Sequence, residues 1–275
     1  MPYDPKKELK RVTDYYSQDA LQDRFSAIIS GDTGAGKSYL LRSARLPIHI
    51  DSFDPGGTKP LKDLIRSDSN PNGQIVADTR WESEDPFNPT AYKLWERETE
   101  VRLRTGYFDM FGTYALDSLS TFSDAIMNHV MHTAKGGSRA GEAPMHRRDY
   151  NPQKTHVVNK IKRLMLLKCD FFLMAHLREL EDSNTDIKGN IYKTYQYRLN
   201  ITGNAITTVP LLFDELYVLK GTGSPVKRDL ITDSQGKYIA RSRLNNLGKL
   251  KSMEKPDIKE LLKKADLKWE DKTAL

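Results

Sequence analysis

Short apolar runs alternate with longer amphipathic segments along most of this sequence. Six runs have the length and composition of buried β-strands, and they lie at Phe25–Ile29, Pro47–Asp51, Gln74–Asp78, Thr113–Ser118, Phe171–Ala175 and Glu215–Lys220. Apolar residues at helical spacing predict helices between several of these runs, at Asn88–Arg104, Phe122–Thr133 and Pro152–Lys168. Strands that alternate with helices indicate an α/β fold with a mainly parallel central sheet flanked by helices.

Turn-forming residues predict where this regular pattern is interrupted. The segment Lys135–Tyr150 has no periodicity and is rich in turn formers, so we expect a mobile loop there. The polar stretch Glu179–Asn204 predicts a hairpin that turns at Lys188–Asn190. Further on, Val226–Thr232 and Lys237–Arg243 predict a second, C-terminal antiparallel hairpin.

The two ends of the chain are polar. Residues 1–24 form a short lead-in to a single domain that we expect to extend over residues 1–250. The tail, residues 251–275, contains a predicted charged helix at Pro256–Ala265, either a packed cap or a partly free interaction arm. Within the domain, Asn88 is the expected N-cap of the helix that ends at Arg104, because Pro89 suits a first helical turn.

Composition narrows the class of protein. The formal net charge of +6 permits an anionic partner without demanding one, and the single cysteine, Cys169, excludes an internal disulfide and fits a reducing compartment. The N-terminus has no apolar signal core, and no apolar run approaches the length of a membrane span. We therefore expect a cytoplasmic protein without membrane contact.

The segment Ser30–Leu40 carries the most specific motif of the chain. It follows an apolar strand and contains the phosphate-loop pattern G-x-x-x-x-G-K-[ST], in which glycines let successive N–H groups point at phosphate oxygens. Lys37 would bring its charge to the β- and γ-phosphates, and the Ser38 hydroxyl is placed to ligate Mg²⁺. The predicted nucleotide-binding residues are Gly31, Asp32, Thr33, Gly34, Ala35, Gly36, Lys37, Ser38 and Tyr39.

Asp117 is the second candidate for this chemistry. It ends an apolar strand well after the phosphate loop, and a carboxylate in that place suits Mg²⁺ or its water shell. A strand-end aspartate can instead merely cap the next helix. The phosphate loop favours the metal role.

Together these motifs resemble those of RecA-type proteins. Leu116-Asp117-Ser118-Leu119 looks like their second nucleotide motif, and Ala175-His176-Leu177-Arg178 resembles the segment that carries their γ-phosphate sensor. With the closing segment from Phe213 to Arg243, the chain is most similar to phage-type RecA-like nucleotide-binding proteins, some of which are single-strand-annealing recombinases. The resemblance implies a RecA-like core, ATP and Mg²⁺ as ligands, single-stranded DNA as partner and a homo-oligomeric ring or filament.

The resemblance also implies roles for individual residues. RecA-type ATPases place a water-orienting glutamate after the strand next to the phosphate loop, whereas this chain offers Asp51 or Asp54. Either aspartate can act as base, or Asp51 can end the strand while Asp54 only forms a turn. His176 is the expected γ-phosphate sensor, although a lone histidine is often a core residue. Arg241 and Arg243 are expected to act in trans on a neighbouring protomer's ATP, unless they only form a solvated strand face.

Two stretches predict contact with DNA. Residues 133–168 hold nine Lys/Arg and two Asp/Glu, which concentrates the positive charge of the chain. Residues 179–204 interleave tyrosines with cations, a combination that suits base stacking and backbone neutralisation on single strands but also describes a two-faced hairpin strand. The candidate DNA-binding residues are Arg147, Arg148, Lys188, Tyr192, Lys193, Tyr195 and Arg198.

The leading hypothesis is therefore a RecA-like ATPase that binds single-stranded DNA in recombination, annealing or replication. An ATP-gated DNA-binding or loader module with little turnover is a second hypothesis, because the expected glutamate is missing. A P-loop kinase, with Lys135–Tyr150 as a phosphate-covering lid, is the third.

Overall fold

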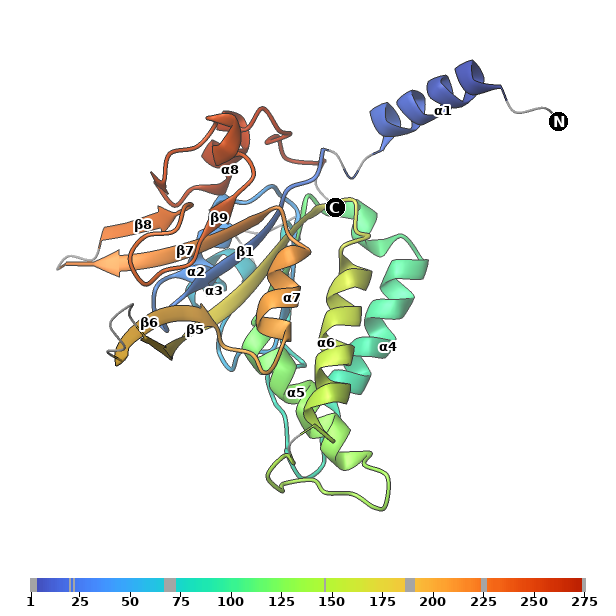
Figure 1. Cartoon of the computed structure of the whole chain (residues 1–275). Coiled ribbons are helices and arrows are strands. Elements are labelled where there is room, and N and C mark those ends of the chain that lie inside the picture. Colours follow the sequence, from blue (N-terminus) through green and yellow to red (C-terminus); the bar gives the residue numbers. More distant parts are fainter. Residues whose placement is uncertain are drawn as a thin grey trace.

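The computed structural model describes residues 4–19, 21, 23–66, 73–145, 147–185, 191–223 and 227–273. A ten-stranded sheet forms its centre (Figure 1). Its strands lie in the order β10-β8-β7-β1-β5-β4-β2-β3, and β6 and β9 extend it from β5 and β7. The strands are β1 (Ser26–Gly31), β2 (Ile48–Ser52), β3 (Ile75–Asp78), β4 (Thr113–Asp117), β5 (Asp170–Thr185), β6 (Ile191–Leu199), β7 (Glu215–Thr222), β8 (Lys227–Ile231), β9 (Arg241–Ser242) and β10 (Met253–Glu254).

The strand directions confirm the predicted α/β fold. Strands β7, β1, β5, β4, β2 and β3 are parallel neighbours, whereas β6, β8, β9 and β10 pair antiparallel. A C-terminal antiparallel hairpin is present, but the predicted pairing of its segments is wrong. Strand β8 pairs with β7, and β9 pairs with an earlier part of β7, because the long β7 offers a full partner to both.

Helices cover both faces of the sheet, except for α1 (Pro5–Gln18). The others are α2 (Lys37–Leu40), α3 (Lys62–Ile65), α4 (Ala91–Arg104), α5 (Leu119–His132), α6 (Tyr150–Leu164), α7 (Ala205–Leu211) and α8 (Ile258–Lys264). Figure 1 shows α4, α5, α6 and α7 gathered on one side of the sheet. Short 3₁₀ turns lie at Leu41–Ser43, Lys59–Leu61, Tyr107–Met110 and Asn245–Leu247.

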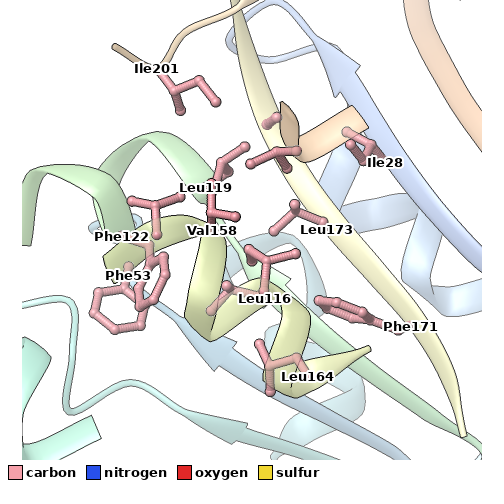
Figure 2. Packing of buried hydrophobic residues seen from close by; sticks show 14 of the residues in the cluster. Ile28, Phe53, Leu116, Leu119, Phe122, Val158, Leu164, Phe171, Leu173 and Ile201 are labelled. Atoms are coloured by element: carbon pink, nitrogen blue, oxygen red, sulfur yellow. The ribbon is translucent and has the colours of Figure 1, made fainter. Parts of the chain in front are cut away.

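Alternation along the central strands divides most of the core into two large clusters. On β1, Ile28 belongs to the cluster beneath α4, α5 and α6, whereas Ala27 and Ile29 belong to the cluster on the opposite face. Figure 2 shows the first cluster, in which Leu116 and Leu173 of the sheet lie among residues of the covering helices. Burial on both faces explains why the parallel strands are mostly apolar.

Several boundaries differ from the prediction. Helix α4 begins at Ala91, not Asn88, and the Glu84 carboxylate accepts a hydrogen bond from the Ala91 N–H at 3.0 Å. Glu84 thus supplies an acceptor at the helix start from seven residues upstream, which a local capping rule does not detect. Strand β5 continues to Thr185 and pairs with β6 as the predicted hairpin, whose turn at Lys188–Asn190 lies outside the described residues.

The two ends of the chain differ in how they pack. Helix α8 buries Ile258, Leu261 and Leu262 in the second core cluster, so it is a packed cap of the sheet. Helix α1, which the sequence pattern did not predict, has no buried residue and extends away from the sheet in Figure 1. No helix in the described ranges is long and apolar enough to cross a membrane.

Candidate functional site

The phosphate loop connects β1 to α2 at the carboxyl edge of the parallel strands. Gly34 and Gly36 have φ values of 81° and 100°, a backbone region that L side chains rarely adopt. A Cβ on Gly31 would lie 2.5 Å from the carbonyl oxygen of Leu219 on β7, so only glycine fits there. The helix after the loop is short, because α2 ends at Leu40 and a 3₁₀ turn follows.

Lys37 is folded back over the loop that contains it. Its Nζ donates to the carbonyl oxygens of Gly31 and Asp32 at 3.0 and 3.1 Å, and only 6% of the residue is exposed. Burial lowers the pKa of Lys37, although the nearby carboxylates of Asp117 and Asp54 oppose this shift. A cation held by neutral carbonyl oxygens in a buried place is well prepared to receive an anion.

Ser38 and Asp117 meet directly, as the magnesium prediction requires. The Ser38 hydroxyl donates to Asp117 Oδ2 at 2.5 Å, and Asp117 is 1% exposed at the end of β4. Burial and the neighbouring Asp54 raise the pKa of Asp117, while Ser38 and Lys37 counteract the rise. This oxygen pair suits a hard cation such as Mg²⁺, which takes few protein ligands and shares the phosphates of its substrate. Within the described residues, no cluster of three or more His, Cys, Asp or Glu side chains suits a metal.

His176 joins the phosphate loop to Asp54. The register pairs it with Gly31, since β5 lies between β1 and β4 in the sheet. Its Nδ1 lies 3.4 Å from Lys37 Nζ, and its Nε2 lies 3.2 Å from Asp54 Oδ2. Because an ammonium group only donates, we assign the ring proton to Nε2, where it can be donated to Asp54.

The loop that carries Asp54 is held from two sides. The Asp54 and Phe53 amides donate to the Asp117 carbonyl oxygen at 3.2 and 2.5 Å, because β2 and β4 are parallel neighbours. From the other side, Glu82 accepts from the Ser52 hydroxyl at 2.6 Å and from the Gly56 N–H at 2.9 Å. Sequence reasoning missed Glu82, which lies 26 residues beyond Gly56 in an irregular segment without a motif.

Asp51, the alternative base, does not reach this site. It is fully buried, and its carboxylate accepts from Trp81 Nε1, Trp95 Nε1 and the Tyr114 hydroxyl at 3.1, 2.9 and 2.8 Å. Burial alone would raise the pKa of Asp51, but His49 and Arg102 lower it well below its usual range. Asp51 as a candidate base is therefore corrected, because β2 turns it into the core under α4, whereas Asp54, the other candidate, faces the phosphate loop.

A cavity of about 480 Å³ opens between these parts. It is lined by Thr33, Gly34, Gly36, Lys37, Ser38, Tyr39, Asp54, Pro55, Gly56, Gly57, Pro60, His176 and Arg228. The structure thus brings most of the predicted nucleotide-binding residues to one cavity, together with Asp54 and His176. A larger hollow of about 620 Å³ lies along α4 and is lined by residues such as Lys93, Arg97 and Glu100, which belong to none of these motifs.

The two predicted trans arginines lie away from this cavity. Arg241 donates to the carbonyl oxygens of Pro210 and Phe213 at 2.8 and 2.7 Å, so it holds the end of α7 in its own chain. Arg243 forms an ion pair with Asp214 at 2.6 Å, and 60% of its side chain is exposed. Of these two arginines, only Arg243 has a largely exposed side chain.

The residues of the β5–β6 hairpin that were predicted to bind DNA mostly contact acidic or other side chains. Lys193 lies 2.7 Å from Glu181, and Arg198 donates to Gln196 at 2.9 Å. The Tyr195 ring lies under the ammonium group of Lys237, at 4.9 Å. Lys188 and the side chain of Tyr192 lie outside the described residues.

A second cavity of about 480 Å³ lies beside the start of α6 and has a basic lining. Arg147 lines it, as do Lys154 and Arg178, which sequence reasoning did not select, and no acidic side chain is among the described residues around it. Arg178 follows the predicted sensor His176 on β5 by two positions, and its buried Nε has no hydrogen-bond partner in the described part of the chain. Arg148 donates instead to the Lys135 carbonyl oxygen at 2.6 Å.

Comparisons with known proteins address the family and the fold. Residues 24–244 match the model of a family described as AAA domain. No curated protein sequence matches the chain. Among solved structures, the flagellar accessory protein FlaH from Methanocaldococcus jannaschii is 14% identical with a TM-score of 0.38, over 75% of this chain and 76% of that one. An ATPase from the type III secretion system of pathogenic bacteria is also 14% identical with a TM-score of 0.38, over 71% of this chain and 52% of that one.

Proposed function

Because the chain belongs to the AAA domain family, we propose that it binds ATP with Mg²⁺, hydrolyses the γ-phosphate and acts on single-stranded DNA. The observation that carries the proposal is the convergence of Lys37, Ser38, Asp54 and His176 on one cavity, with Asp117 buried directly behind Ser38, although these residues lie on separate segments between residues 37 and 176. Such a constellation supplies each group that phosphoryl transfer to water needs.

Each residue has a defined task in this mechanism. Lys37 would neutralise the terminal phosphates, and a bound anion would offset the cost of burying its charge, which lowers its pKa. Ser38 and Asp117 would hold Mg²⁺, which neutralises charge on the phosphate oxygens when bound. Asp54 is the candidate that orients water and accepts its proton, since its carboxylate is 29% exposed at the cavity.

His176 would keep Asp54 in position. Its Nε2 proton is donated to Asp54, while its Nδ1 faces Lys37. A phosphate that draws Lys37 toward itself would change the partner of Nδ1, and His176 can relay that change along β5. The second cavity begins two residues later, at Arg178, so the two cavities share this strand.

The DNA part of the proposal is supported by the lining of the second cavity. Arg147, Lys154 and Arg178 surround it, and no ion pair involves them within the described residues. Unpaired cations suit the phosphate backbone of a nucleic acid, whereas the paired Lys193 contributes less. A role in phage-type recombination or annealing, and assembly into a ring or filament, are finer parts of the proposal that rest on the resemblance of the motifs.

Hydrolysis measured with and without single-stranded DNA tests the proposal. Wild-type protein should release phosphate from ATP in the presence of Mg²⁺, faster when DNA is added, and Lys37→Ala should abolish both rates. ATP-dependent DNA binding without phosphate release would instead favour a loader with little turnover. Transfer of the γ-phosphate to an acceptor other than water would identify a kinase.

Paired substitutions test the DNA surface. Arg178→Ala should weaken DNA binding and lower the slope of log affinity against log salt by about 1, the loss of one phosphate contact. Lys193→Ala is the matched control, because it also removes one cation, but one already paired with Glu181. Equal effects of the two substitutions would refute the assignment of the second cavity.

A further inference from the structure

Arg228 lies against the phosphate loop from the opposite side to His176. It is the second residue of β8, which pairs antiparallel with β7, and β7 in turn pairs with β1. Its Nε donates to the Ala35 carbonyl oxygen at 2.9 Å. A Cβ built on Gly36 would lie only 2.8 Å from the same Nε, so the guanidinium packs directly on the loop backbone.

This contact leaves the rest of the guanidinium group open toward the cavity. Arg228 lines the cavity together with Lys37, and within the described residues no carboxylate forms an ion pair with it. A guanidinium carries five N–H donors in a fixed fork, of which the Nε bond to Ala35 uses one. The bond therefore fixes the direction of the group without using the two NH₂ groups, the arrangement that bidentate recognition of phosphate requires.

We propose that Arg228 binds the phosphates of the nucleotide in the site of its own chain, as a second cation beside Lys37. This role rests on the proposed function, because it concerns the same cavity. It also changes which arginine acts there: Arg241 is bonded to carbonyl oxygens of its own chain and Arg243 is paired with Asp214, whereas Arg228 needs no neighbouring protomer to reach the loop.

Nucleotide affinity provides the first test. Arg228→Ala should weaken binding of a fluorescent ATP analogue by about tenfold or more, as expected for loss of a charge-assisted hydrogen-bond pair. Arg228→Lys should recover only part of the affinity, since an ammonium keeps the charge but not the fork. Lys227→Ala is the matched control: it removes one positive charge from the neighbouring position of β8, whose side chain points to the other face of the strand.

The same measurements separate phosphate binding from a purely structural role. If Arg228 only supports the loop, Arg228→Ala should lower the melting temperature of the nucleotide-free protein, and the affinity it retains should keep the wild-type salt dependence. If Arg228 contacts phosphate, the salt dependence of ATP binding should decrease, whether or not loss of the bond to Ala35 also lowers the melting temperature. Unchanged ATP affinity in Arg228→Ala would refute the proposal, whereas a wild-type protein that binds no nucleotide would refute the proposed function itself.

Mixing two impaired variants, at an ATP concentration too low to fill the site of Arg228→Ala, tests whether Arg228 acts within its own chain. Lys37→Ala and Arg228→Ala each damage one component of the site. If both residues serve the site of the same chain, a mixture of the two proteins contains no intact site and should remain as slow as the separate variants. Recovery of phosphate release in the mixture would show that Arg228 acts across an interface and would overturn the assignment in cis.

Discussion

At the scale of residues, two aspartates three positions apart have opposite environments. Asp51 is enclosed in the core, where it accepts hydrogen bonds from Trp81, Trp95 and Tyr114. Asp54 lies in the following loop, partly exposed and bonded to His176. The apolar pattern of β2 does not distinguish them, because the donors to Asp51 come from segments 30 to 63 residues away.

Asp54→Asn should therefore act on turnover and leave binding intact. An amide cannot accept the proton of the attacking water, so we expect phosphate release to fall by about 10²–10⁴. The affinity for a fluorescent ATP analogue should stay within a few-fold of wild type, since Lys37 and the loop amides are untouched. Rapid-quench hydrolysis and equilibrium titration measure the two quantities. Wild-type turnover in this variant would exclude Asp54 as the base.

Asp51→Asn should act on stability instead. The change leaves Arg102, which lies 3.2 Å from Asp51 and is mostly buried, without one of its two charged partners. Breaking a buried ion pair on one side costs about 3–5 kcal/mol. Urea denaturation should therefore show a large decrease in the free energy of unfolding, while any protein that remains folded should bind ATP normally. A folded, stable and inactive Asp51→Asn protein would contradict this division of roles.

At the scale of elements, the parallel strands could be predicted from the sequence, whereas the pairing of the antiparallel strands at the sheet edge could not. A short apolar run is typical of a central parallel strand that is buried on both faces. Strands β1, β2, β4 and β5 accordingly begin within a few residues of their predicted starts. Strand β9 pairs with the start of β7 although β8 lies between them in the sequence, which is a non-local choice, whereas β8 pairs with the end of β7, the strand directly before it. Arg228 reaches the phosphate loop only through this pairing, which is why no motif indicated it.

The two terminal helices make a matched pair for testing packing. Leu262→Ala in α8 removes a fully buried side chain from the second core cluster, which should lower the free energy of unfolding by about 3 kcal/mol. Leu9→Ala in α1 makes the same chemical change at a residue that is 70% exposed, so the stability of a single chain should change little. Chemical denaturation compares the two. Equal destabilisation would mean that α1 is packed in solution.

At the scale of the whole molecule, Asp170 connects three distant parts of the chain. At the start of β5, its carboxylate accepts from the Phe25 N–H at 3.0 Å and from Arg45 at 3.2 Å. Arg45 in turn donates to the Glu270 carbonyl oxygen of the C-terminal tail at 3.0 Å. Burial raises the pKa of Asp170 to about 6, even though Arg45, the Phe25 N–H and Arg24 favour the ionised form.

The raised pKa predicts how stability changes with pH. In the unfolded chain Asp170 should titrate near pH 4, so between about pH 4 and pH 6 the folded protein binds the extra proton and stability falls as pH rises. The difference of about two between the folded and unfolded pKa values corresponds to about 3 kcal/mol of folding stability. This stabilisation is present below pH 4 and lost above pH 6. The side chain in the Asp170→Asn variant cannot titrate, so the stability of this variant should lack this dependence on pH. Unfolding free energies measured from pH 4 to 7 should therefore show the wild-type value decreasing relative to the variant, and a constant difference across this range would contradict the buried, proton-binding state of Asp170.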